Sequence, residues 1–332
     1  MEPTSHTDRR PADAASWVSV VMPCLNAGEH LREAVASVLA QELPPHWRLE
    51  LLLVDDGSRD ALTLAIIEQV RTDPRVRVFT NPSPQGVSRA RNQAIAAAQG
   101  SLIAFLDADD LWTPQHLATH IEALQAHAAA FSASDYAHID AQGRTLATAC
   151  QWSSPHKGAW LQAGLGERPS AVFQNAAELF IKACPVWICT AVVRREALGE
   201  GPVFNEALAL AEDLELWIRL ARSHTFVFCR ASTAMYRKVG DSLTNSAGPA
   251  RLDDVTAAML EDLAERPGFA PHRPMLRETA GAYHLSAAYG YKLLGRRGRA
   301  FASLLRALRC LPRDARPYRQ LLALPLPVRS AH

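Results

Sequence analysis

Residues 101–114, SLIAFLDADDLWTP, join a short apolar run to a group of carboxylates. Leu102–Leu106 are apolar, and three of the next four residues are aspartates. A short apolar run that ends at polar residues predicts a buried strand. Ligands of open α/β sheets bind beyond the carboxyl ends of strands, and oxygen ligands favour Mg²⁺ or Mn²⁺. The stretch predicts either a divalent-cation site or a solvated turn in which Asp110 or Thr113 caps the next helix.

The chain before this stretch alternates apolar runs with helical periodicity. The predicted strands are Trp17–Met22, Leu49–Val54, Val76–Phe79 and Leu102–Leu106, and the predicted helices are Gly28–Gln41, Ala61–Val70 and Val87–Gln99. Short connections between alternating strands and helices favour an α/β fold with a mostly parallel sheet flanked by helices. The loops Pro23–Asn26, Asp55–Ser58 and Asp107–Asp110 then lie at one edge of the sheet.

The pattern loosens after residue 130 and becomes helical near the end. We expect strands at Phe131–Tyr136, Val186–Val193 and Thr225–Cys229, a long loop at Gln151–Arg168, and helices at Glu212–Arg222, Arg251–Leu263, Pro271–Leu294 and Arg297–Cys310. The arginines and leucines of the last helix form an amphipathic basic surface, which leaves peripheral membrane contact open beside an ordinary solvated helix face.

Composition narrows the class of protein. The formal net charge of +1 gives no argument for a nucleic-acid partner. Six cysteines are scattered without metal-ligand spacing, so reduced thiols are expected. The polar first sixteen residues do not read as a secretory signal, and no run of about 18 apolar residues predicts a transmembrane helix. We therefore expect a cytoplasmic protein.

Two nucleotide-binding motifs are missing. The turn after the first strand, Pro23–Gly28, is not a Gly-x-Gly-x-x-Gly fingerprint, and no phosphate loop ending in Gly-Lys-Ser/Thr occurs. A dehydrogenase and a phosphate-loop NTPase are therefore disfavoured. The remaining candidate for holding a diphosphate is the aspartate cluster at Asp107–Asp110 with a divalent cation.

Four motifs, in order, resemble those of the family 2 glycosyltransferases, which have the GT-A fold. They are VSVVMPCLN, LLLVDDGS, GVSRARNQAIAAAQGSLIAFLDADD and EDLELWIRL, over residues 17–222. The resemblance implies a flexible N-terminus at 1–15, a GT-A domain at 16–245 and a helical C-terminal extension at 246–332. The GT-A domain would have a nucleotide-binding half at about 16–130 and an acceptor half at about 131–245.

The resemblance also implies site residues. A nucleotide-sugar donor, expected to be a UDP-sugar, would contact Pro23, Leu25, Asn26, Asp55, Asp56, Arg91, Asp107 and Ala108. Asp109 and Asp107, from the DXD motif, would bind Mn²⁺ or Mg²⁺, which neutralises charge on the departing diphosphate. Asp213 would be the general base of an inverting transfer to a saccharide or lipid-linked saccharide in polysaccharide or glycan biosynthesis.

Each of these assignments has a structural alternative. Asp55 and Asp56 could belong only to a capped turn, Arg91 could lie on a solvated helix face, and Glu212 and Asp213 could only complement a helix dipole. Asp110 and the tryptophans Trp187 and Trp217 are interpreted as structural.

The sequence departs from the family pattern at two positions. Leu25 stands where an aromatic residue is frequent, and Val239 where a histidine often follows Tyr-Arg, so phosphate contact is left to Arg237, Lys238, Ser242 or Thr244. The Gln-x-x-Arg-Trp motif and membrane helices of processive synthases are absent, which favours single-sugar transfer. An inactive nucleotide-sugar binder, a nucleotidyltransferase and a helical interaction protein stay open as alternatives.

Overall fold

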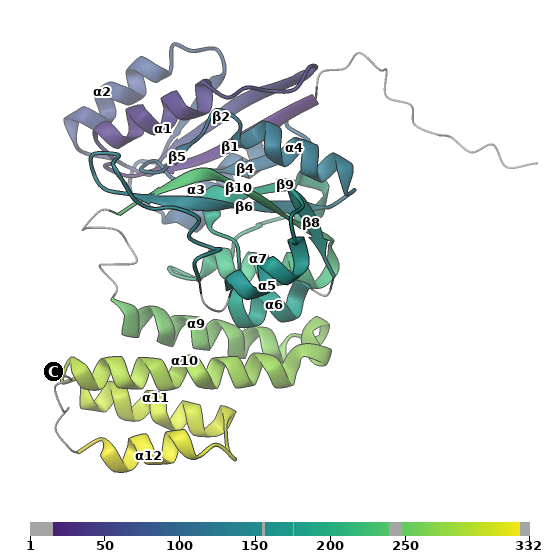
Figure 1. Cartoon of the computed structure of the whole chain (residues 1–332). Helices are drawn as coiled ribbons and strands as arrows, with labels where there is room; N and C mark the ends of the chain where they lie inside the picture. Colours follow the sequence, from purple (N-terminus) through teal and green to yellow (C-terminus); the bar gives the residue numbers. More distant parts are fainter. Residues whose placement is uncertain (1–15, 155–156, 175, 239–247, 326–332) are drawn as a thin grey trace, which may run out of the picture.

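A single mixed sheet forms the centre of the molecule, as described by a computed structural model at residues 16–154, 157–174, 176–238 and 248–325 (Figure 1). Its strand order is β3-β2-β1-β4-β9-β6-β10-β5, with β7 paired to β6 and β8 paired to β10. The first four strands in this order are mutually parallel, whereas β9 runs antiparallel to both of its neighbours. The sheet is therefore parallel in its first half and mixed in its second.

The first half follows the predicted alternation of strands and helices. Its elements are β1 (Ser16–Cys24), α1 (Glu29–Leu39), β2 (Trp47–Asp55), α2 (Ala61–Val70), β3 (Val76–Thr80), α3 (Val87–Ala97) and β4 (Leu102–Phe105). The carboxyl ends of β1, β2 and β4 share one edge, as expected.

The second half is more irregular. It contains β5 (Leu111–Trp112), α4 (His116–Ala126), β6 (Phe131–Ile139), β7 (Thr145–Ala147), α5 (Lys157–Leu165), β8 (Ser170–Phe173), α6 (Ala176–Ala183), η1 (Ile188–Thr190), β9 (Ala191–Arg194), η2 (Arg195–Leu198), α7 (Glu212–Ser223) and β10 (Phe226–Arg237). β10 extends well past the short strand predicted at Thr225–Cys229.

The sheet separates two hydrophobic cores, because side chains alternate along each strand. On β1, Val18, Val20 and Met22 belong to the core covered by α1, α2 and α4, whereas Val21 belongs to the other core. That second core is covered by α3, α5, α6 and α7, and it includes the fully buried Trp217. The interpretation of Trp217 as a core residue is confirmed.

The predicted loop at Gln151–Arg168 is wrong, because α5 lies within it. Its glycines mark close approaches. A Cβ on Gly158 would lie 2.0 Å from the Trp152 carbonyl oxygen, and one on Gly164 would lie 2.0 Å from the Phe173 ring. Glycine serves tight packing here, so its abundance did not indicate irregular backbone.

A layered helical extension covers α7 on the side away from the sheet (Figure 1). It comprises α9 (Pro249–Glu265), η3 (Pro267–His272), α10 (Arg273–Leu293), α11 (Arg297–Cys310) and α12 (Ala315–Ala323). The three predicted helices are confirmed, and α12 was not predicted. No helix among the described ranges has the length and apolar character needed to cross a bilayer.

The extension shares its core with the sheet domain. Leu260 and Phe269 belong to the same buried cluster as Trp217. The Arg266 guanidinium reaches Glu215 of α7 at 2.7 Å, and Glu215 is only 1% exposed. The α9 and α7 helices are therefore joined by apolar contact and by a buried ion pair.

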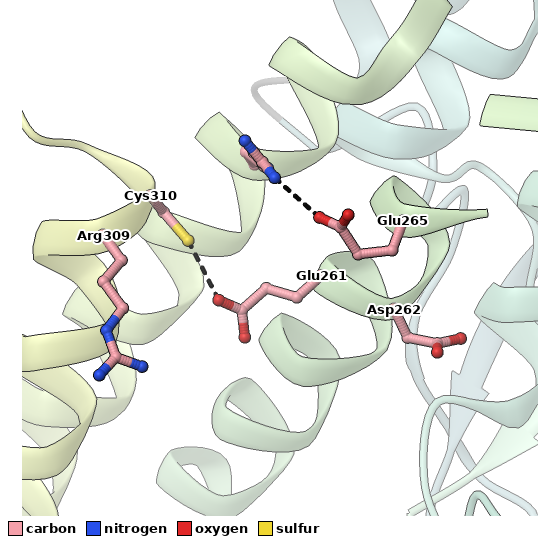
Figure 2. A pocket seen from close by; sticks show the side chains of 6 residues that line it. Glu261, Asp262, Glu265, Arg309 and Cys310 are labelled. Atoms are coloured by element: carbon pink, nitrogen blue, oxygen red, sulfur yellow. Dashed lines mark hydrogen bonds and ion pairs between the residues drawn. The ribbon is translucent and has the colours of Figure 1, made fainter. Parts of the chain in front are cut away.

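An acidic cleft of about 390 Å³ lies between α9 and the end of α11 (Figure 2). Cys310 donates to Glu261 at 3.2 Å, and Arg277 pairs with Glu265 at 2.8 Å. Figure 2 shows Arg309 on the α11 side of this cleft. These polar contacts link successive helices of the extension.

Because the core is continuous, Leu260→Ala should lower the free energy of unfolding of the whole described body by about 2–5 kcal/mol. Urea unfolding followed by tryptophan fluorescence and by circular dichroism should give coincident transitions shifted to lower urea. Leu322→Ala, at a side chain 81% exposed, is the matched control and should leave the midpoint nearly unchanged. Two separate transitions in Leu260→Ala would contradict a shared core.

Candidate active site

The predicted loops meet at the carboxyl edge of the parallel strands. The Asn26 amide donates to Ser58 Oγ at 2.8 Å, and Asn26 Oδ1 accepts from the Arg59 amide at 2.8 Å. Leu106, just past β4, donates its amide to the Val21 carbonyl at 3.1 Å. The ends of β1, β2 and β4 are thereby held side by side.

Three residues predicted to contact a donor differ in exposure. Leu25 is 46% exposed, Pro23 is half-buried within β1, and Ala108 is buried. Leu25 therefore presents an apolar side chain to solvent at the edge where the loops meet. Their contact with a donor stays a prediction.

Asp55 shapes the turn after β2. Its carboxylate is buried and accepts a hydrogen bond from the Ser58 amide at 2.9 Å. Gly57 within the turn has φ +85°, and a Cβ there would lie 2.8 Å from the Ser83 backbone. Glycine is required here both for the left-handed conformation and for the close approach.

Asp56 holds the loop that precedes α3. Its buried carboxylate accepts from Asn81 Nδ2 at 2.8 Å and from the amides of Gln85 and Gly86 at 2.9 and 2.8 Å. These bonds occupy both oxygens and explain the burial of the carboxylate. Donor contact by Asp56 stays a prediction, beside this structural role.

The Arg91 guanidinium bridges two carboxylates from distant parts of the chain. Nη2 lies 2.8 Å from Asp107 Oδ1, and Nη1 lies 2.8 Å from Glu212 Oε1. Arg91 is 3% exposed, which rules out the solvated helix face considered above. Its charge also lies over the Phe204 ring, 5.3 Å from the centroid. Arg91 therefore links the end of β4 to the start of α7.

Arg237 binds the acidic turn, Asp107–Asp110, through Asp109 and Asp110. It is fully buried, and its Nε donates to the Asp109 carbonyl at 2.8 Å while its amide donates to Asp110 Oδ1 at 2.9 Å. Nη2 pairs with Glu33 of α1, and Nη1 donates to the Ala141 carbonyl. Every guanidinium nitrogen of Arg237 is thus engaged within the protein. Contact of Arg237 with phosphate, one of the options left open above, stays a prediction.

Asp110 and Asp109 of the acidic turn, Asp107–Asp110, differ in their partners: Asp110 has a structural hydrogen bond, whereas Asp109 lacks an ion pair among the described residues. Asp110 is fully buried and bonded to the Arg237 amide, as its structural interpretation requires. Burial, followed by the charge of Asp107, raises the pKa of Asp109 to about 6. Among the described residues no basic side chain forms an ion pair with the Asp109 carboxylate, although Asp107 pairs with Arg91. Asp109 is therefore a half-buried carboxylate of the acidic turn without an ion-pair partner among the described residues, which fits a cation site.

Asp213 lies half-buried in the first turn of α7, next to Glu212. Burial, followed by the charge of Glu212, raises the pKa of Asp213 to about 7, while Arg91 opposes the increase. The residue before the pair, Ala211, caps the helix with a left-handed φ of 60°. The structure thus groups Asp107, Glu212 and Asp213 around the buried guanidinium of Arg91.

Two residues of this arrangement, Glu212 and Glu33, were not given a site role from the sequence, and Arg237 was given a different one, phosphate contact. Glu212 orients Arg91, and Arg237 and Glu33 clamp the acidic turn. The only available signal was the position of Glu212 beside Asp213, since Glu33 and Arg237 are 204 residues apart. Val239, Ser242 and Thr244 lie outside the described residues.

The sequence matches the family model described as glycosyl transferase family 2 over residues 19–200, which is more than half of the chain. The chain belongs to glycosyl transferase family 2. This membership confirms the resemblance seen in the sequence motifs and makes the protein a glycosyltransferase.

Curated relatives include TuaG of Bacillus subtilis strain 168, a glycosyltransferase provisionally assigned to teichuronic acid biosynthesis. It is 28% identical over 230 residues, covering 69% of this chain and 82% of the relative. WfgD of Escherichia coli, named a UDP-Glc:α-D-GlcNAc-diphosphoundecaprenol β-1,3-glucosyltransferase, is 26% identical over 69% of this chain and 80% of the relative.

Among solved structures, TarS 1-349 of S. aureus in complex with UDP-GlcNAc matches with a TM-score of 0.66 at 18% identity. The match covers 90% of this chain and 82% of that one. This likeness shows a shared fold and confirms the predicted GT-A architecture with its C-terminal helices.

Removing the bridging cation should be costly, because Arg91→Met leaves Asp107 and Glu212 without their shared partner. We expect the free energy of unfolding to fall by about 3–5 kcal/mol at pH 7, measured by urea unfolding. The matched control is Arg89→Met on the same helix, whose pair with Glu206 is exposed and should contribute at most about 1 kcal/mol. Equal midpoints for the two variants would show that the bridge does not stabilise the fold.

Proposed function

We propose that this glycosyltransferase moves a single sugar from a nucleotide-sugar donor, a UDP-sugar, to an acceptor hydroxyl with inversion at the anomeric carbon. The observation that carries the proposal is the grouping of Asp213 with the Arg91 bridge and the acidic turn at one edge of the sheet. Such a grouping places a candidate base and a candidate diphosphate site within one network of side chains.

Asp213 is the proposed general base. It would accept the proton of the acceptor hydroxyl as the acceptor oxygen bonds to the anomeric carbon and the bond from that carbon to the diphosphate oxygen breaks. A base functions best when its pKa lies near the working pH, and burial beside Glu212 raises the pKa of Asp213 to about 7. Arg91 keeps this increase limited, so the carboxylate is still available as a base near neutral pH.

Asp109 and Asp107 are the proposed ligands of Mg²⁺ or Mn²⁺. The fit rests on the placement of Asp109 beside Asp107 without an ion pair of its own among the described residues, and burial raises the pKa of Asp109 to about 6. Within the described ranges no group of three ligand side chains gathers, so the donor diphosphate and water would complete the coordination. When bound, the metal supplies electrostatic stabilisation of the leaving diphosphate.

The nucleotide is proposed to lie along the loops after β1 and β2, at Pro23, Leu25, Asn26, Asp55 and Asp56. Arg91 has both Nη atoms engaged with carboxylates. We therefore assign Arg91 the orientation of Asp107 rather than direct contact with the donor. An inactive nucleotide-sugar binder shares these features, and only turnover distinguishes it.

The acceptor is proposed to be a saccharide, free or lipid-linked, bound near Trp187. The segment from Cys184 to Cys189 approaches both halves of the site. Burial, and more weakly the charge of Asp213, raise the pKa of Cys184 to about 12, and burial followed by the charge of Asp110 raises the pKa of Cys189. Half-buried Trp187 lies between them, held by hydrogen bonds to Thr190.

Aromatic rings surround Trp187 and extend this surface. Its ring stacks on Tyr136 at 5.6 Å between centroids and meets Tyr236 edge-on at 4.8 Å. A rigid, partly exposed indole of this kind suits the apolar face of a sugar ring. The interpretation of Trp187 as a core residue therefore holds only in part.

Asp213→Asn should abolish transfer while donor binding persists. In a screen of UDP-sugars with Mn²⁺, the donor that raises the melting temperature of the unsubstituted protein should raise that of Asp213→Asn equally. The kcat of Asp213→Asn should be lower by about 10²–10⁴-fold. In the unsubstituted protein, kcat/KM should rise with pH and level off above about 7, because the base must be deprotonated. Glu122→Gln, at an exposed carboxylate of α4, is the control.

Two outcomes would contradict this proposal in different ways. Retained turnover in Asp213→Asn would refute the base role alone. If no nucleotide sugar stabilised the protein with metal present, the donor-site assignment itself would fail.

Trp187→Ala should raise KM for a saccharide acceptor by about tenfold or more, with little change in KM for the donor. Trp187→Phe keeps a ring and should recover most of the lost affinity. An equal change in both KM values, or a lowered melting temperature as the only effect, would assign Trp187 to the core.

A further inference from the structure

Positive charge is concentrated at one end of the chain. Residues 289–325 contain nine lysines and arginines and one acidic residue, Asp314, for a net charge of +8. The whole chain carries +1, so the other residues together carry −7. Such an asymmetry indicates a surface that meets an anionic partner.

Large apolar side chains are exposed in the same segment. Of eleven large hydrophobic residues exposed in the described parts of the chain, seven lie here, with Leu322 at 81% exposure. Six of them form an aromatic–leucine pair at i,i+4 on each of three helices, namely Tyr289–Leu293 on α10, Phe301–Leu305 on α11 and Tyr318–Leu322 on α12. Residues four apart share one helix face, so each pair forms a short apolar stripe.

These stripes are not needed to hold the extension together. The opposite side of α11, at Ala300, Leu304 and Ala307, is buried and supplies the packing. In Figure 1, α11 and α12 lie at the end of the molecule farthest from the sheet. The stripes on α11 and α12 therefore stand on the outermost helical layer, and the third stripe lies at the end of α10, which packs on α11.

Part of the basic charge is available to a partner. Arg306 and Arg316 pair with Asp254 and Asp314, and Arg309 lies by the acidic cleft of Figure 2. Arg299 lies over the Tyr291 ring. Four other exposed arginines form neither an ion pair nor a ring contact within the described residues, namely Arg296, Arg297, Arg313 and Arg319.

We propose that the face formed by the end of α10 with α11 and α12 docks on an anionic phospholipid bilayer. Basic residues beside exposed aromatic and leucine side chains are what an interfacial helix presents to headgroups and to the acyl boundary. A second copy of this face would bring two strongly positive surfaces together, which disfavours a symmetric dimer. A nucleic acid would leave the apolar stripes in water.

The proposal is tested by co-sedimenting the full chain with vesicles of phosphatidylcholine and phosphatidylglycerol at 3:1, and with vesicles of phosphatidylcholine alone. Binding should occur only to the anionic vesicles and be lost in 0.5 M salt. Replacing Arg296, Arg297, Arg313 and Arg319 by Gln should lower the partition coefficient several hundredfold, at about fivefold for each arginine. Phe301→Ser with Leu322→Ser should also lower it, since apolar insertion is lost.

The matched control is Leu62→Ser with Leu64→Ser, which removes two similarly exposed leucines from α2 at the other side of the molecule. This variant should bind vesicles like the unsubstituted chain, and all variants should keep its melting temperature. Equal binding to neutral vesicles or no binding to anionic ones would overturn the proposal. So would a dimer in size-exclusion chromatography that the Phe301 and Leu322 substitutions dissolve, or binding to a random oligonucleotide that matches binding to vesicles.

Discussion

The buried ion bridge from Asp107 through Arg91 to Glu212 connects the two halves of the sheet where chemistry is proposed. A guanidinium that is 3% exposed is stable only if carboxylates compensate its lost hydration. The bridge therefore requires α3, the end of β4 and the start of α7 to converge. Because Glu212 precedes Asp213, the same bridge sets where the proposed base stands relative to the acidic turn.

Electrostatic imbalance distinguishes this site from an ordinary structural network. Three carboxylates, at Asp107, Glu212 and Asp213, surround the single charge of Arg91. Asp109 lies beside Asp107, and the nearby Arg237 is paired with Glu33. The raised pKa values of Asp109 and Asp213 express that excess of negative charge. A cation between the acidic turn and a diphosphate would compensate the charge of Asp109, and proton uptake from an acceptor would neutralise Asp213.

The extension contributes to this arrangement through α7. Glu215, two residues beyond Asp213, is 1% exposed and pairs with Arg219 and with Arg266 at the end of α9. The helix that carries the proposed base is therefore packed between the sheet and the extension. The outermost helices, α11 and α12, which carry most of the basic face, are separated from α7 by α9 and α10. Docking of that face on a bilayer would therefore leave the site unaltered.

Local patterns determined the strands and helices of the first half and the shared edge of their loops, whereas the candidate roles of Asp55, Asp109 and Asp213 came from the resemblance of the motifs to the family. The strands, helices and shared edge depend on periodicity and turn chemistry, which near neighbours in the chain define. Tertiary structure decided what those patterns leave open. It buried Arg91, engaged Arg237 with Glu33 across 204 residues, and turned the glycines of α5 into packing positions. Each of these outcomes depends on partners distant in sequence, and burial and pairing of charge are set only when those partners meet.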